Sequence, residues 1–143
     1  MIKRLNRYVL SKIMGIRLRP VGAVFLGGFA GVSLTTTVLP EVIATLGVTD
    51  SFSARIDLAG YAVYSFLAWA FGGWVAQRTA STQAGGVVLG LVGLASGALF
   101  AFLAYGTQTE LLLVCAAAGL AYGTVGGMLI AAALRGNDRS APN

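Results

Sequence analysis

Four stretches of about twenty mostly apolar residues follow one another along the chain, and they restrict the possible folds more than any other feature. They cover residues 21–39, 56–75, 84–105 and 111–134. A helix that crosses a bilayer needs about 20 such residues. The connections between the stretches are short, which makes neighbouring helices antiparallel. The sequence therefore predicts an all-α fold, an integral membrane four-helix up-down bundle over residues 20–135.

The composition agrees with a membrane location and argues against catalysis. Hydrophobic residues make up 57% of the chain and charged residues only 10%, whereas about 25% charged is usual for soluble domains. There is no histidine, and Cys115 is the only cysteine. The carboxylates lie at the edges of the apolar stretches, so no acid–base pair or activated nucleophile is expected. We predict no enzymatic activity, no cofactor and no metal site.

The first nineteen residues differ from the rest of the chain. Apolar residues recur there at spacings of three and four, at Ile2, Leu5, Val9, Ile13 and Ile16. This pattern predicts an amphipathic helix in the membrane interface. The basic residues expected to contact the anionic cytoplasmic leaflet, rather than nucleic acid, are Lys3, Arg4, Arg7, Lys12, Arg17 and Arg19. The alternative is a flexible basic leader that only orients the protein. At the other end of the chain, we expect residues 136–143 to form a polar tail.

The distribution of charge predicts the orientation. With the N-terminus in the cytoplasm, four spans return the C-terminus to the same side. The cytoplasmic side then also holds Arg78, Arg135 and Arg139, whereas the other side holds Arg55, Glu41, Asp50, Asp57 and Glu110. This arrangement satisfies the positive-inside rule. We therefore expect both termini in the cytoplasm and a location in a bacterial inner membrane.

Glycines are concentrated inside the apolar stretches, with five in the thirteen residues 85–97. In water each glycine inside a helix costs about 1 kcal/mol relative to alanine. In lipid, small residues instead let two helix backbones approach closely. The predicted helix-packing residues are Gly27, Gly31, Gly72, Gly86, Gly90, Gly93, Gly97, Gly119, Gly123 and Gly127. They can pack within the bundle, between copies of the chain, or against a partner's helix.

Hydroxyl groups, a proline and a carboxylate gather near the end of the first apolar stretch, in SLTTTVLPEV. A helix broken at Pro40 could line a cation or proton path with Thr35, Thr36, Thr37 and Glu41. In the structural alternative the threonines bond to their own helix, Pro40 bends or ends it, and Glu41 meets water.

The segment FGGWVAQRTASTQAGGVVLGLVGL, residues 71–94, contains Gly72, Gly73, Ala76 and Arg78. Gly86, Gly90 and Gly93 follow after a short polar turn. This segment resembles a pattern in small bacterial four-span membrane proteins of uncharacterised function, in which a GGxxAxR motif ends the second span. The resemblance implies a four-span integral membrane protein and no particular activity.

These observations favour a non-enzymatic integral membrane protein that acts as a structural or accessory component, alone or in a larger membrane complex. One alternative is an oligomeric channel or transporter that uses Thr35–Thr37 and Glu41. Another is a holin-like protein that permeabilises the membrane. Each class agrees with the size of the chain and its short connections.

Overall fold

The structure, a computed structural model, describes residues 20–47, 57–79 and 81–135. Every regular element in these ranges is a helix. Three helices are long and apolar enough to cross a membrane, and they cover Pro20–Thr45, Thr82–Tyr105 and Thr109–Ala133. The all-α class and the presence of helices able to cross a membrane are thus confirmed. The predicted interfacial helix at residues 1–19 and the polar tail lie outside the described residues.

The first helical run, Pro20–Thr45, continues through Pro40. It includes a π-helical segment, η1 (Leu34–Val38), followed by α2 (Leu39–Thr45). The backbone N–H of Leu39 donates to the carbonyl of Leu34, five residues back. Proline lacks an N–H and its ring crowds the carbonyl four residues earlier. We attribute the passage through Pro40 to the wider π turn directly before it, where one helical hydrogen bond is already displaced.

The π segment also changes the neighbour of this run. Before η1, Gly27 lies against α3 (Leu58–Arg78), where an added Cβ would meet the backbone of Trp69. After η1, α2 packs against α5 (Thr109–Arg135), and its inward residues Leu39 and Ile43 are buried. One extra residue in a turn rotates the following face by about 100°. The rotation lets one helical run contact two different helices.

The helix α3 begins at an Asp57 cap, whose side chain accepts a hydrogen bond from the Ala59 N–H at 3.2 Å. At its other end the Thr79 hydroxyl donates to the Ala76 carbonyl at 2.6 Å. This helix is not among the three helices apolar enough to be recognised as spans. Its aromatic residues with polar groups, Tyr61, Tyr64, Trp69 and Trp74, lower its mean hydropathy.

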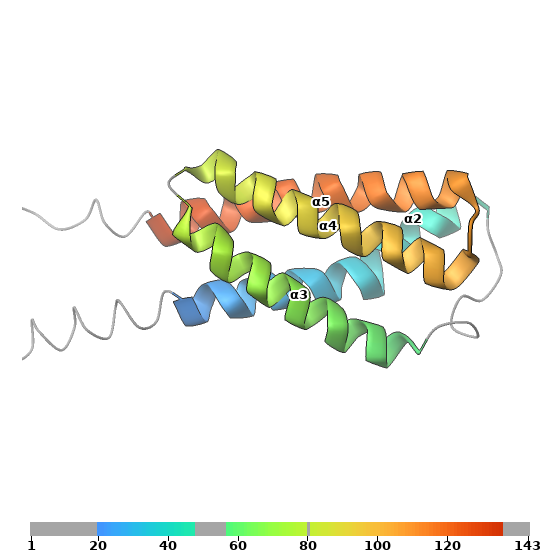
Figure 1. Ribbon diagram of the computed structural model, residues 1–143, viewed down its shortest axis with the longest axis horizontal. Coiled ribbons are helices and arrows are strands. Elements are labelled where there is room, and N and C mark those ends of the chain that lie inside the picture. Colours follow the sequence, from blue (N-terminus) through green and yellow to red (C-terminus); the bar gives the residue numbers. More distant parts are fainter. Residues whose placement is uncertain (1–19, 48–56, 80, 136–143) are drawn as a thin grey trace, which may run out of the picture.

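The helices α4 (Thr82–Tyr105) and α5 form the most extensive contact among the described elements. The side chain of Ser81 caps α4 by accepting a hydrogen bond from the Ala84 N–H at 3.0 Å. Gly106 ends the helix with a φ of 71°, which favours glycine. The connection of residues 106–108 then reverses the chain into α5. Figure 1 shows the two helices side by side along their length.

The helix ends gather at two opposite ends of the molecule (Figure 1). The start of the first helical run, which begins at Pro20, lies at one end together with the end of α3, the start of α4 and the end of α5. The end of α2, the start of α3 and the connection from α4 to α5 lie at the other end. The first and last described residues therefore emerge on the same side.

The outward surface of these helices is largely apolar. Phe29, Phe71 and Leu129 are each more than 60% exposed, and all four helical segments contribute further examples. Soluble proteins rarely expose contiguous apolar surface of this extent, whereas hydrocarbon is a good solvent for it. Inside, the fully buried residues include Trp69, Leu89 and Phe100. This distribution is consistent with an integral membrane protein.

Candidate functional site

The predicted packing glycines of α4 and α5 lie where the two backbones meet. A Cβ added to Gly93 would collide with the carbonyl oxygen of Gly119, and one added to Gly119 would collide with the carbonyl oxygen of Gly93. The same kind of collision pairs Gly97 with Cys115, Gly123 with Leu89, and Gly127 with Gly85. Gly86 and Gly90 instead approach the side chains of Met128 and Thr124. At the four backbone contacts there is no space even for a methyl group.

The first helical run meets α3 in the same way. An added Cβ on Gly27 would collide with the Trp69 carbonyl oxygen and lie 3.1 Å from the Cα of Gly73. Gly31 lies beneath the Trp69 side chain, which occupies the space that a Cβ would need. Gly72 points elsewhere, toward Leu89 of α4, whose Cδ2 would lie 2.8 Å from a Cβ.

Gly73 was not among the packing glycines predicted from the sequence, yet it makes the backbone contact with the first run. Neighbouring residues on a helix point about 100° apart. The pair Gly72–Gly73 therefore serves two interfaces, one with α4 and one with the first run. A spacing of four along one helix does not reveal which member of an adjacent pair faces which neighbour.

Five buried side chains with polar groups form what we call the inner polar cluster: Thr35, Tyr61, Ser65, Trp69 and Ser96. One part joins the first run to α3. The Thr35 hydroxyl lies 3.0 Å from the Gly31 carbonyl oxygen and 3.0 Å from the Ser65 hydroxyl. The Ser65 hydroxyl lies 3.0 Å from the same carbonyl oxygen. The Gly31 carbonyl is thus the shared acceptor of this part of the cluster.

The other part of the inner polar cluster joins α3 to α4 through Ser96. The Tyr61 hydroxyl donates to the Ser96 carbonyl at 2.6 Å, and the Trp69 indole N–H donates to the Ser96 hydroxyl at 3.1 Å. Edge-on contact between Tyr61 and Phe100, with centroids 5.5 Å apart, holds the tyrosine ring in place. Hydrogen bonds of this kind connect helices in lipid, where no water competes for the groups.

Sequence reasoning missed most of the inner polar cluster. Trp69 and Ser96 each carry one polar group within an apolar helix. Only the hydrogen bond between them, which the structure shows, indicates that they join α3 to α4. Gly93 and Gly97, which flank Ser96, make their closest contacts with α5, so the glycine spacing alone did not indicate the bonds of Ser96 to α3.

The four residues of the predicted transport path do not share one surface of the molecule. Thr35 is fully buried in the inner polar cluster, whereas Thr36, Thr37 and Glu41 are exposed. The Thr36 hydroxyl donates to the Val32 carbonyl of its own helix at 2.8 Å. The membrane-surface residues predicted between Lys3 and Arg19 lie outside the part of the chain that the structure describes.

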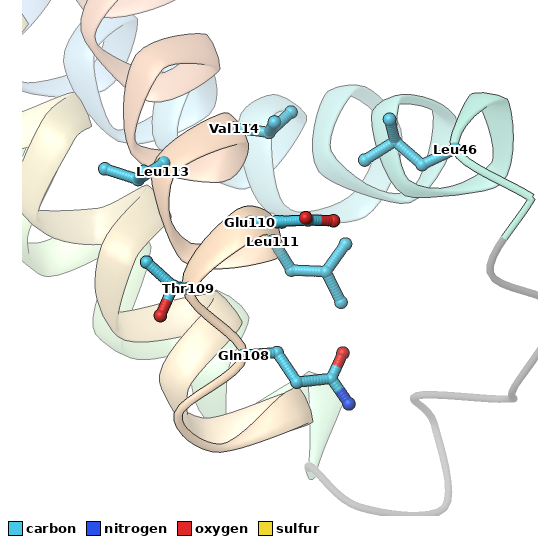
Figure 2. Close-up of a pocket in the computed structure, with 7 residues that line it drawn as sticks. All are labelled: Leu46, Gln108, Thr109, Glu110, Leu111, Leu113 and Val114. Atoms are coloured by element: carbon cyan, nitrogen blue, oxygen red, sulfur yellow. The ribbon is translucent and has the colours of Figure 1, made fainter.

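A pocket of about 720 Å³ lies at the end of the molecule opposite Pro20. It is lined by Leu46 and by residues 108–111, 113 and 114, at the start of α5. Figure 2 shows Gln108, Glu110 and Leu111 extending to the same side, toward α2 and Leu46. Glu110 lies in the first turn of α5, where a carboxylate favours the positive end of the helix dipole. The pocket thus combines one carboxylate with mainly apolar walls.

Within residues 20–47, 57–79 and 81–135, no three His, Cys, Asp or Glu side chains come together. Cys115 is fully buried at the α4–α5 contact. The fold and the site define an all-helical protein with helices that can cross a membrane. No family model, curated protein or solved structure matches the chain.

Proposed function

We propose that this chain is a non-enzymatic small integral membrane protein, a four-helix up-down bundle that serves as a structural or accessory component of the membrane or of a larger complex. The observation that carries the proposal is that polar side chains face the interior of the protein and apolar side chains face outward. The inner polar cluster is buried and hydrogen-bonded between helices, while large apolar side chains such as Phe29 and Leu129 are exposed. The buried polar groups thus form hydrogen bonds that join the helices to one another.

In this bundle α3 is the remaining span, in addition to the three apolar helices. Its 21 residues correspond to a length of about 31 Å, close to the hydrocarbon thickness of about 30 Å. Tyr61 and Trp69, which lower its hydropathy, are buried and bonded to Ser96. In this position their polar groups do not face lipid.

Charge supports an orientation with the Pro20 end in the cytoplasm of a bacterial inner membrane. Arg78 and Arg135 end their helices on that side, whereas Asp57 and Glu110 lie at the opposite ends of the same helices. Basic residues are retained on the cytoplasmic side of spans. The basic residues before Pro20 would then meet the anionic cytoplasmic leaflet.

The orientation predicts a simple labelling result. Single cysteines replace Thr107, between α4 and α5, or Ser81, between α3 and α4; both residues are exposed. We expect a membrane-impermeant maleimide to label Thr107→Cys in intact cells, and Ser81→Cys only after permeabilisation. The unmodified chain is the control, because its Cys115 is buried. The opposite labelling would exclude this orientation, and labelling of both cysteines in intact cells would exclude the membrane crossing between them.

An oligomeric channel is the second candidate, because Thr36, Thr37 and Glu41 are all exposed near one end of the first run. Glu41 lies four residues before Thr45, the last residue of α2, and is therefore about 6 Å from the end of the helix along its axis. Several copies could turn these groups toward a common path. The fourth residue of that path, Thr35, is already bonded inside a single chain.

Flux measurements separate the two candidates. For an accessory protein we expect vesicles containing the purified chain to pass no more protons or monovalent cations than empty vesicles, with Glu41→Gln behaving identically. Thr45→Val, which removes a hydroxyl that is bonded to Val42 at 2.6 Å, is the matched control near the same helix end. Flux that Glu41→Gln abolishes and Thr45→Val preserves would establish the channel and overturn the accessory role. Large unselective leakage would instead indicate a permeabilising protein.

A further inference from the structure

A small apolar groove of about 270 Å³ opens on the outward face between the first helical run and α3. Its walls are Val24, Ala70, Phe71 and Trp74. It adjoins the contact at which Gly27 and Gly73 bring the two backbones together. Helices that touch at glycines leave a hollow where the larger side chains on either side diverge. The groove is below the usual size of small-molecule pockets, about 300–1,000 Å³, so it suits a chain lying along the surface.

A row of aromatic rings leads from this groove to a positive charge. Phe71 and Trp74 have ring centroids 5.8 Å apart. The guanidinium carbon of Arg78 lies 3.9 Å from the centroid of the Trp74 ring. Residues 71, 74 and 78 are spaced by three and four, so they follow one face of α3 to its last turn. The row thus changes from apolar to cationic toward the end of the helix.

The position of Arg78 leaves its charge available to an external anion. The side chain is exposed, and the described carboxylates Glu41, Asp57 and Glu110 belong to the opposite end of the molecule. Stacking on Trp74 fixes the plane of the guanidinium group while leaving its N–H donors free to bind phosphate oxygens.

We propose that this groove and Arg78 form a binding site for an anionic phospholipid. One acyl chain lies against Val24, Ala70 and Phe71, and the phosphate contacts Arg78 beside Trp74. The site has the two chemical parts of a phospholipid in the correct order, apolar toward the middle of α3 and cationic at its end. This inference rests on the membrane embedding proposed above, because only an embedded chain presents the groove to lipid.

Brominated lipids test the site, because bromine quenches nearby tryptophan fluorescence. The full chain is placed in phosphatidylcholine vesicles that contain equal fractions of either brominated phosphatidylglycerol or brominated phosphatidylcholine. One arginine near the surface is worth about 1 kcal/mol toward an anionic lipid, or about fivefold in affinity. We expect an apparent affinity about fivefold higher for brominated phosphatidylglycerol, and we expect Trp74→Phe to remove this difference because Trp69 is buried.

Matched variants assign the preference to the groove. Arg78→Gln should abolish it, whereas Arg135→Gln, at the end of α5 on the same side, should preserve it. Phe71→Ala should weaken quenching by the anionic lipid, whereas Leu67→Ala, an equally exposed position of α3 outside the groove, should not. Added inorganic phosphate should leave the preference unchanged.

Three results would overturn the site: equal quenching by the two lipids, an equal loss in Arg135→Gln and Arg78→Gln, or loss of the preference on addition of free phosphate. Equal quenching would leave the membrane embedding intact. Failure of both lipids to quench would contradict the embedding itself. The experiment therefore separates an error in the site from an error in the proposed function.

Discussion

Replacement of Gly119 by leucine is expected to separate α4 from α5 and to lower the free energy of unfolding by about 3 kcal/mol or more. An added Cβ at this position already collides with the Gly93 carbonyl oxygen, before the rest of the side chain is considered. Backbone atoms in two packed helices cannot move aside as a flexible side chain can. The alanine variant should therefore destabilise as well, by a smaller amount. Reversible unfolding in mixed detergent micelles measures both values.

Gly126→Leu is the matched control on the same helix. Nothing lies within 4 Å of a Cβ added at Gly126, so a side chain there enters open space. We expect a change within about 0.5 kcal/mol. If Gly119→Leu and Gly126→Leu were equally stable, the close approach of α4 and α5 at Gly93 and Gly119 would be wrong.

Replacement of Trp69 by alanine is expected to cost about 3–5 kcal/mol. The Trp69 side chain is fully buried, lies over Gly31 of the first run and contacts the Tyr122 ring of α5 at a centroid distance of 5.9 Å. Its indole N–H also binds Ser96 of α4. One side chain thus joins α3 to three other helical segments, and its removal leaves a cavity at their common contact.

Two further variants divide this effect into packing and hydrogen bonding. Trp69→Phe keeps most of the ring but loses the donor, and should cost about 1 kcal/mol, in the range found for hydrogen bonds between membrane helices. Combined with Ser96→Ala in a double-mutant cycle, it should show a coupling energy of about 0.6 kcal/mol or more. Phe71→Ala, an exposed aromatic residue of the same helix, is the control and should change little. A Trp69→Ala variant as stable as Phe71→Ala would contradict the central position of Trp69.

The sequence was most informative where one physical requirement acts along the whole chain. Apolar stretches of about twenty residues predict helices that can cross a membrane, and helices of this kind are present at Pro20–Thr45, Thr82–Tyr105 and Thr109–Ala133. The first helix was predicted to end at Leu39. It reaches Thr45 because the π segment before Pro40 displaces a backbone hydrogen bond, and this depends on local geometry that hydropathy does not report.

The candidate site was less predictable, because it depends on which faces of the helices meet. The repeated glycines indicated smooth helix surfaces. Their partners, such as Gly93 with Gly119 and Gly27 with Gly73, appear only once the helices are packed. Thr35 was predicted to line a path, whereas its hydroxyl is bonded to Gly31 and Ser65. A residue's type gives its capacity for hydrogen bonding, but the neighbouring helix decides whether that capacity is used internally.

By itself, the sequence determined the helical secondary structure of the apolar segments and their capacity to cross a membrane, because a chain in hydrocarbon must satisfy its backbone hydrogen bonds within each segment. Only the tertiary structure decided that Trp69 joins α3 to three other helical segments, that the first run changes neighbours at η1, and that Arg78 lies over Trp74 beside an apolar groove. These features depend on the rotation of each helix about its axis. That rotation is set by packing between residues far apart in the chain.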